Sequence, residues 1–121
     1  MPLPIITEIT DRNHFGDLLK SNPGLFILKF GAEWCGPCKT INQGVQWYFE
    51  RTPDTVQCAI IDIDKCIDVY SFLKSKRVVN GVPVLLCYKK GNVTHVPDDV
   101  IIGADKNKIN DFFIRCNKML A

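Results

Sequence analysis

The feature that most constrains the fold is the apolar run Leu25–Phe30, which is interrupted by a single charged residue, Lys29. Turn-forming residues precede the run at positions 21–24, and Gly31 follows it. A strand that is apolar on both sides is typical of a sheet covered on both faces, as in folds built from parallel strands. We therefore expect residues 25–30 to form a central strand with helices packed on each side of it.

The rest of the chain alternates between strand-like and helix-like patterns. Runs of β-branched and apolar residues predict strands over residues 3–9, 56–63, 82–88 and 93–102, the last interrupted at residues 97–99. Helical spacing predicts helices over residues 11–21, from residue 37 to 51, over 67–76, and after Asp105. This order predicts one α/β domain spanning residues 1–121, with parallel pairing of the first strands and a mixed sheet of about five strands between helices on both faces.

Composition and charge narrow the classes of function. The 121 residues are 46% hydrophobic and 23% charged, with a formal net charge of +2, which argues against disorder, a nucleic-acid partner or binding to an anionic membrane. No apolar run approaches the roughly 20 residues of a membrane-spanning helix, and the N-terminus does not resemble a signal peptide. We expect a cytoplasmic monomer.

Chemistry is indicated by the sequence Trp34-Cys35-Gly36-Pro37-Cys38, at the junction of the central strand and the next helix. Two cysteines at this spacing on one helical turn lie close enough to form a disulfide. The first meets free N–H groups and the positive end of the helix dipole, which stabilise its thiolate, whereas the second is more shielded. Gly36 permits a tight entry, and Pro37 falls in the first turn, where its missing N–H has no consequence. We expect Cys35 to attack a substrate disulfide and Cys38 to resolve the mixed disulfide.

Two alternative interpretations of this pair are half of a zinc site and two structural thiols. Zinc usually takes a second closely spaced Cys or His pair, and the other cysteines and both histidines are scattered, so we expect no metal. Core positions are expected for three inert thiols: Cys58, Cys87 and Cys116. Cys66 follows charged residues at a helix start, so we expect it to be exposed and consider it a candidate regulatory thiol.

Residues 30–39 closely resemble the active-site segment of thioredoxins. The likeness continues at residues 61–64, at residues 80–84, which are similar to the family's cis-proline loop, and at residues 102–104. The resemblance implies the thioredoxin fold and a protein-disulfide reductase whose redox centre is the Cys35–Cys38 dithiol, with no bound cofactor. It also implies a cis peptide bond before Pro83 and a shallow substrate groove, which would be lined by Trp34, Ile63, Gly81, Val82, Pro83, Gly103 and Ala104.

The partners implied by the resemblance are disulfide-containing proteins as substrates and an electron donor like thioredoxin reductase. A second class of function stays open, in which a thioredoxin-like module binds a partner and the dithiol is a redox-dependent latch. Lys29, Gly31 and the added length at residues 97–99 favour the binding module, whereas the intact Cys35 and Cys38 favour the enzyme.

Lys29 departs from the family pattern. Thioredoxins usually carry a buried acidic residue at this position, and often a tryptophan where this chain has Gly31. A buried, charged lysine would favour a nearby thiolate, whereas a buried, neutral one could accept a proton. The alternatives are that Lys29 extends to the surface or pairs with a carboxylate. Our hypothesis is that Lys29 tunes Cys38, while Trp34, Gly36, Pro37 and Pro83 help to position the dithiol.

Overall fold

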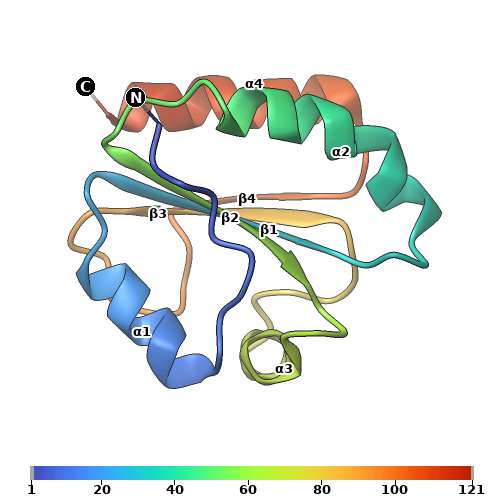
Figure 1. Ribbon diagram of the computed structural model, residues 1–121, viewed down its shortest axis with the longest axis horizontal. Helices are drawn as coiled ribbons and strands as arrows, with labels where there is room; N and C mark the ends of the chain where they lie inside the picture. The colour runs from blue at the N-terminus through green and yellow to red at the C-terminus, as the bar shows by residue number, and fades with distance from the viewer. Residues whose placement is uncertain (1, 121) are drawn as a thin grey trace.

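The computed structural model describes residues 2–120. The elements are, in chain order, α1 (Arg12–Lys20), β1 (Leu25–Gly31), α2 (Gly36–Phe49), β2 (Val56–Asp62), α3 (Ile67–Ser75), β3 (Val84–Lys89), β4 (Asp99–Ile102) and α4 (Lys106–Met119) (Figure 1). All four expected helices are present among residues 2–120, and the side chains of Asp11 and Asp105 cap the N-termini of α1 and α4. Among residues 2–120, no helix has the length and apolar character needed to cross a membrane.

The strands form one mixed sheet in the order β2-β1-β3-β4. β1 and β2 pair in parallel, whereas β1 with β3 and β3 with β4 pair antiparallel. Figure 1 shows α2 and α4 covering one face of the sheet and α1 and α3 covering the other. The expected α/β class, with helices on both faces of a mixed sheet, is therefore confirmed.

The central place of β1 follows from its apolar character, since all seven of its residues are buried. Phe26, Leu28 and Phe30 belong to the core beneath α1 and α3, while Leu25 and Ile27 belong to the core beneath α2 and α4. Because side chains alternate along a strand, position 29 also faces α2 and α4. The one charged residue of the strand therefore points into a helix-covered face.

Four chain segments meet at one end of the sheet. Gly31 and Asp62 end β1 and β2 side by side, Val84 begins β3 opposite Phe30, and Ile102 ends β4 opposite Val84. Among the four strands described, parallel pairing is therefore limited to β1 and β2, and the expectation of parallel pairing is wrong for β3. Figure 1 shows α3 end-on, so this helix runs across the strand direction and does not carry the chain back to the far end of the sheet. The chain consequently enters β3 at the end where β2 stops.

The expected strand over residues 3–9 is reduced to one isolated bridge between Ile6 and Ala59. Within the described residues 2–120, the sheet therefore has four strands where we expected about five. Pro4 contributes to this result because it has no N–H to donate to a ladder.

The expected return strand over residues 93–102 is confined to Asp99–Ile102. The loop before it is held by side chains rather than by a strand ladder. Asp98 Oδ2 accepts hydrogen bonds from the Lys89 backbone N–H over 2.7 Å and from Asn92 Nδ2 over 3.0 Å. These contacts satisfy the polar groups of the turn without strand pairing.

Candidate active site

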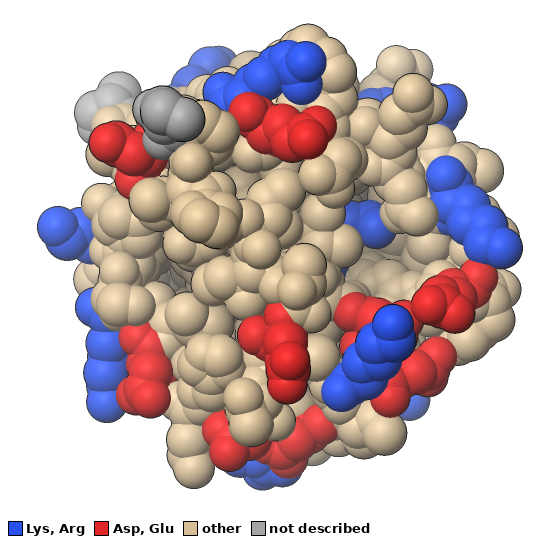
Figure 2. Space-filling model, viewed as in Figure 1, with Lys and Arg blue, Asp and Glu red and all other residues tan. Residues whose placement is uncertain are grey.

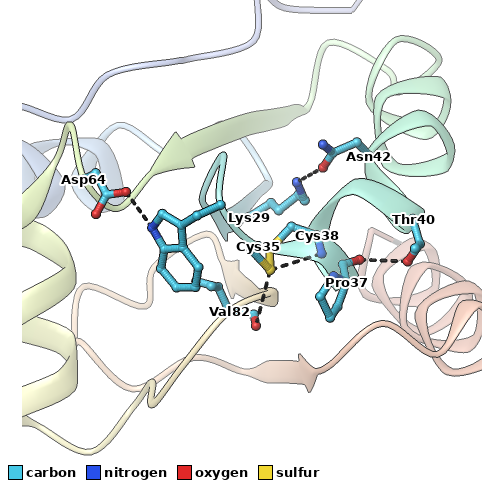
Figure 3. Close-up of a disulfide and its surroundings, with 9 residues drawn as sticks. Lys29, Cys35, Pro37, Cys38, Thr40, Asn42, Asp64 and Val82 are labelled. Atoms are coloured by element: carbon cyan, nitrogen blue, oxygen red, sulfur yellow. Dashed lines mark hydrogen bonds between the residues drawn. A yellow bond between two sulfur atoms is a disulfide. The ribbon is translucent and has the colours of Figure 1, made fainter.

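The dithiol lies where β1 passes into α2. Cys35 is the N-cap residue of α2 and is joined to Cys38 by a disulfide bond (Figure 3). The backbone N–H of Cys38 donates a hydrogen bond to Cys35 Sγ over 3.1 Å. Gly36 is the first helical residue and Pro37 lies in the first turn, as expected. The sulfur of Cys35 therefore occupies the position where helix N–H groups and the helix dipole stabilise negative charge.

The loop before β3 lies against this sulfur. The Val82–Pro83 peptide bond is cis, as the family resemblance implies, and the Val82 carbonyl oxygen lies 3.8 Å from Cys35 Sγ (Figure 3). Gly81 has a φ of +113°, a conformation that favours glycine. Its N–H donates a hydrogen bond to Tyr70 Oη over 2.7 Å. Tyr70, which belongs to α3, thereby fixes the loop beside the dithiol.

A second loop, after β4, joins the same surface. The N–H of Gly103 donates a hydrogen bond to the Pro83 carbonyl oxygen over 2.9 Å. Of the other residues expected in the groove, Ile63 packs against the core beneath α1 and α3, and Ala104 packs against the core beneath α2 and α4. Val82, Pro83 and Gly103 are thus joined by a peptide bond and a backbone hydrogen bond. Ile63 and Ala104 pack against the cores on opposite faces of the sheet.

Trp34 precedes the dithiol and is 67% exposed. Its indole N–H donates a hydrogen bond to Asp64 Oδ2 over 2.8 Å (Figure 3). The backbone N–H of Asp64 in turn donates to Asp62 Oδ1 over 2.8 Å, which holds the acceptor in place. An exposed ring that is fixed in this way offers an apolar contact surface to a partner. Because the ring is already held in place, binding loses little side-chain entropy there.

Lys29 is buried on the α2 side of β1, with 4% of its surface exposed. Its Nζ atom donates a hydrogen bond to Asn42 Oδ1 over 2.5 Å (Figure 3). Within residues 2–120, no carboxylate lies at ion-pair distance from this nitrogen. Burial lowers the pKa of Lys29 from its ordinary value, because apolar surroundings disfavour the charged form. Lys29 therefore neither extends to the surface nor pairs with an acid.

A cavity of about 560 Å³ lies between α2, the end of β2 and the residues that follow β1. Its lining includes Lys29, Gly31, Cys38 and Asn42. Figure 2 shows this face hollowed between α2 and the end of β2, with a basic side chain recessed in the hollow and charges of both signs at its rim. The cavity therefore gives solvent access to the inner side of the dithiol.

Known proteins match the chain over most of its length, and the family model for thioredoxin matches residues 6–115. The chain belongs to the thioredoxin family. Thioredoxin-2 of Saccharomyces cerevisiae is 31% identical over 93 residues, which is 76% of this chain and 85% of the yeast protein. The thioredoxin of Pseudomonas aeruginosa is 32% identical over 88 residues, which is 73% of this chain and 77% of the bacterial protein.

The structure of Trichomonas vaginalis thioredoxin superposes with a TM-score of 0.77 at 27% identity, covering 93% of this chain and 96% of that one. The fold is thus the thioredoxin fold. With its Cys35–Cys38 pair intact, the chain is a thioredoxin-type thiol-disulfide oxidoreductase and disulfide reductase. Membership of the thioredoxin family implies, in general terms, disulfide-bonded protein substrates and a reductase that donates electrons.

The other four cysteines are buried. Cys66 has 4% of its surface exposed, so the expected exposure is wrong; its side chain packs into the core beneath α1 and α3. Burial raises the pKa of Cys58 to about 12. The pKa of Cys87 is also raised, first by its hydrogen bond with Cys116 and then by burial. The expectation of core thiols at these three positions is confirmed.

Three residues that position this thioredoxin site were not expected from the sequence: Asn42, Asp64 and Tyr70. The available signal for Asn42 was its spacing, because it follows Cys38 by one helical turn and shares its side of α2. Asp64 and Tyr70 act on groups that lie 30 and 11 residues away in the chain, which no local pattern indicates.

Proposed function

We propose that Cys35 attacks protein disulfides and that Cys38 resolves the mixed disulfide, which makes the chain a general reductant of disulfide-bonded proteins. The main support is the 3.1 Å hydrogen bond from Cys38 N–H to Cys35 Sγ at the start of α2. This contact favours a thiolate at the first sulfur only. Both sulfur-bearing residues are buried, with 4% of Cys35 and 1% of Cys38 exposed, so the assignment of the first attack depends on the helix N-terminus and on the Val82 loop beside Cys35 Sγ. Cys38 instead lines the inner cavity.

In the proposed substrate complex, an extended peptide lies along the loop at Val82 and Pro83. A strand-like segment in this place would pair with the backbone of Val82 beside the Cys35 sulfur. The exposed side chains of Trp34 and Ile102 offer apolar contacts at its margins. The remaining groove residues in this proposal are Ile63, Gly81, Gly103 and Ala104.

The reaction proceeds in two exchanges. The Cys35 thiolate attacks one sulfur of the substrate disulfide, and the other substrate sulfur leaves with the electron pair of the broken bond. The Cys38 thiolate then attacks Cys35 Sγ, and the second substrate sulfur leaves in the same way. The dithiol has supplied two electrons and has become the Cys35–Cys38 disulfide. An electron donor like thioredoxin reductase would convert this disulfide back to the dithiol. The proposal also takes the chain to be a monomer that acts in the cytoplasm.

Reduction of insulin disulfides by dithiothreitol tests these roles. We expect the wild-type chain to accelerate the reaction and Cys35→Ser to leave the rate at its uncatalysed value. The Cys38→Ser variant should accumulate mixed disulfides with insulin, because the resolving thiol is missing. A wild-type rate no higher than that of Cys35→Ser would favour the alternative of a redox-dependent binding module.

A further inference from the structure

The side chains of Lys29 and Cys38 meet because strand and helix spacings match. Lys29 and Gly31 are two residues apart on β1 and face α2. Cys38 and Asn42 are four residues apart on α2 and share one side of the helix. A strand advances about 6.6 Å over two residues and a helix about 6 Å over four. Asn42 therefore lies against Lys29, and Cys38 lies against Gly31.

Gly31 leaves an open space between the amine and the thiol, which we call the Gly31 gap. A Cβ atom at this position would lie 3.4 Å from Lys29 Nζ and 3.7 Å from Cys38 Sγ. Both groups therefore border the same missing side chain. The gap opens into the 560 Å³ cavity, since all three residues line it. A proton that leaves Cys38 Sγ can therefore reach Lys29 Nζ across the gap, and it can reach solvent through the cavity.

We propose that Lys29 accepts the proton of the Cys38 thiol in the resolving step, and that the Gly31 gap and the cavity carry this proton to solvent. The proposal rests on the roles given above to Cys35 and Cys38. Lys29 in its neutral form takes the S–H proton through a water molecule in the Gly31 gap, while the Cys38 electron pair forms the bond to Cys35 Sγ. The bond from Cys35 to the substrate sulfur breaks, and its electron pair leaves with that sulfur. Lys29 then returns its proton to water in the cavity, and the substrate thiolate takes one from solvent.

The surroundings of Lys29 suit a proton acceptor. Its pKa is lowered by burial, and its hydrogen bond to Asn42 Oδ1 orients the nitrogen. Its cross-strand neighbours Ile60 and Leu85 are apolar. The titratable and charged groups that share the cavity are Cys38 and Lys39 from α2, Glu33 from the segment after β1, and Asp62 from β2. Neither of these two carboxylates forms an ion pair with Lys29 among the described residues.

The reaction of the reduced protein with dithiobis(nitrobenzoate) separates the two steps. Attack by Cys35 releases one coloured nitrothiobenzoate ion, and attack by Cys38 on the mixed disulfide releases a second. We expect Lys29→Met to slow the second release by on the order of a hundredfold near pH 7, and to leave the first within about twofold. The slowing should diminish above about pH 9, where hydroxide ionises thiols without help.

Two matched variants separate the proton path from the fold. Gly31→Ala keeps Lys29 but fills the gap with a methyl group at ordinary contact distance, and it should slow the second release roughly tenfold. Lys39→Met removes another lysine of the cavity and should leave both releases unchanged.

Three outcomes would overturn the proposal. The first is an unchanged second release in Lys29→Met. The second is a normal second release in Lys29→Arg, because arginine keeps its charge and does not give up its proton. The third is equal slowing of both releases at every pH, which indicates a general structural effect. Absence of a fast first release in the wild type would instead contradict the proposed role of Cys35.

Discussion

At the scale of single residues, one hydrogen bond holds the exposed indole of Trp34 beside the dithiol. Asp64→Ala removes the acceptor, so the ring becomes mobile and must be ordered when substrate binds. We expect KM for insulin to rise about two- to fivefold, since hydrogen bonds to charged groups contribute about 1.5–3 kcal/mol and less at exposed sites. Asp64→Asn keeps an acceptor and should stay near the wild-type value. Fluorescence anisotropy in a Trp47→Phe background, where Trp34 is the remaining tryptophan, measures the mobility. Unchanged KM and anisotropy in Asp64→Ala would contradict this role.

Lys29 illustrates how a functional residue can destabilise the fold that carries it. Its pKa is lower in the folded state than its ordinary value of 10.5, so below that pH the unfolded chain binds more protons at this residue than the folded chain. The destabilisation is largest at low pH and disappears as the pH rises through 10.5. Lys29→Met should therefore increase the free energy of unfolding at pH 7 by about 1 kcal/mol. Urea unfolding measures the change, with Lys39→Met as a control that should remain at the wild-type value. A less stable Lys29→Met would mean that the hydrogen bond to Asn42 outweighs the burial of the amine.

At the scale of elements, α3 fixes the loop that precedes β3. Tyr70 Oη accepts the Gly81 N–H over 2.7 Å, and its ring packs edge-on against Phe30 at 5.4 Å. Tyr70→Phe keeps the ring and removes the acceptor. We expect KM for insulin to rise about three- to tenfold and the free energy of unfolding to fall by about 1 kcal/mol.

A matched control for this change is Tyr88→Phe. The Tyr88 hydroxyl donates a hydrogen bond to the His95 carbonyl oxygen over 2.8 Å, in the loop before β4 and away from the dithiol. This variant should lose a similar amount of stability while KM stays unchanged. If both variants raise KM equally, the contact of Tyr70 with Gly81 has no special part in substrate binding.

The same elements show what local patterns can predict. β1 was predictable because a short run of apolar residues bounded by turn residues is typical of a strand buried on both faces. The start of α4 was predictable because Asp105 can cap a helix. The place of Cys35 and Cys38 followed from that strand–helix junction. The direction of β3 was not predictable, because it depends on how α3 crosses the sheet. Burial of Cys66 likewise depends on packing between elements far apart in the chain.

At the scale of the whole molecule, both cores contain acidic groups whose ionisation is suppressed. Burial raises the pKa of Cys58 from 9.0 to about 12 and also raises those of Tyr48 and Tyr88. The pKa of Cys87 is raised by its hydrogen bond with Cys116 and by burial. Between the ordinary and the raised pKa, the folded state holds a proton that the unfolded state has lost. The free energy of unfolding therefore falls as the pH rises through this range.

We expect the free energy of unfolding to be nearly constant from about pH 7 to 8.5 and to fall steeply above about pH 9. Cys58 alone contributes a slope of about −1.4 kcal/mol per pH unit between its two pKa values. Lys29 raises the free energy of unfolding as the pH rises up to 10.5, because its pKa is lowered in the folded state. This effect of one group is smaller than the combined effect of the buried thiols and phenols. Urea unfolding under reducing conditions, in wild type and in Cys58→Val, measures the effect. The stability difference between the two proteins should shift in favour of the variant as the pH rises, because valine has no proton to lose. Parallel pH curves would mean that Cys58 ionises as readily in the folded chain as in the unfolded one.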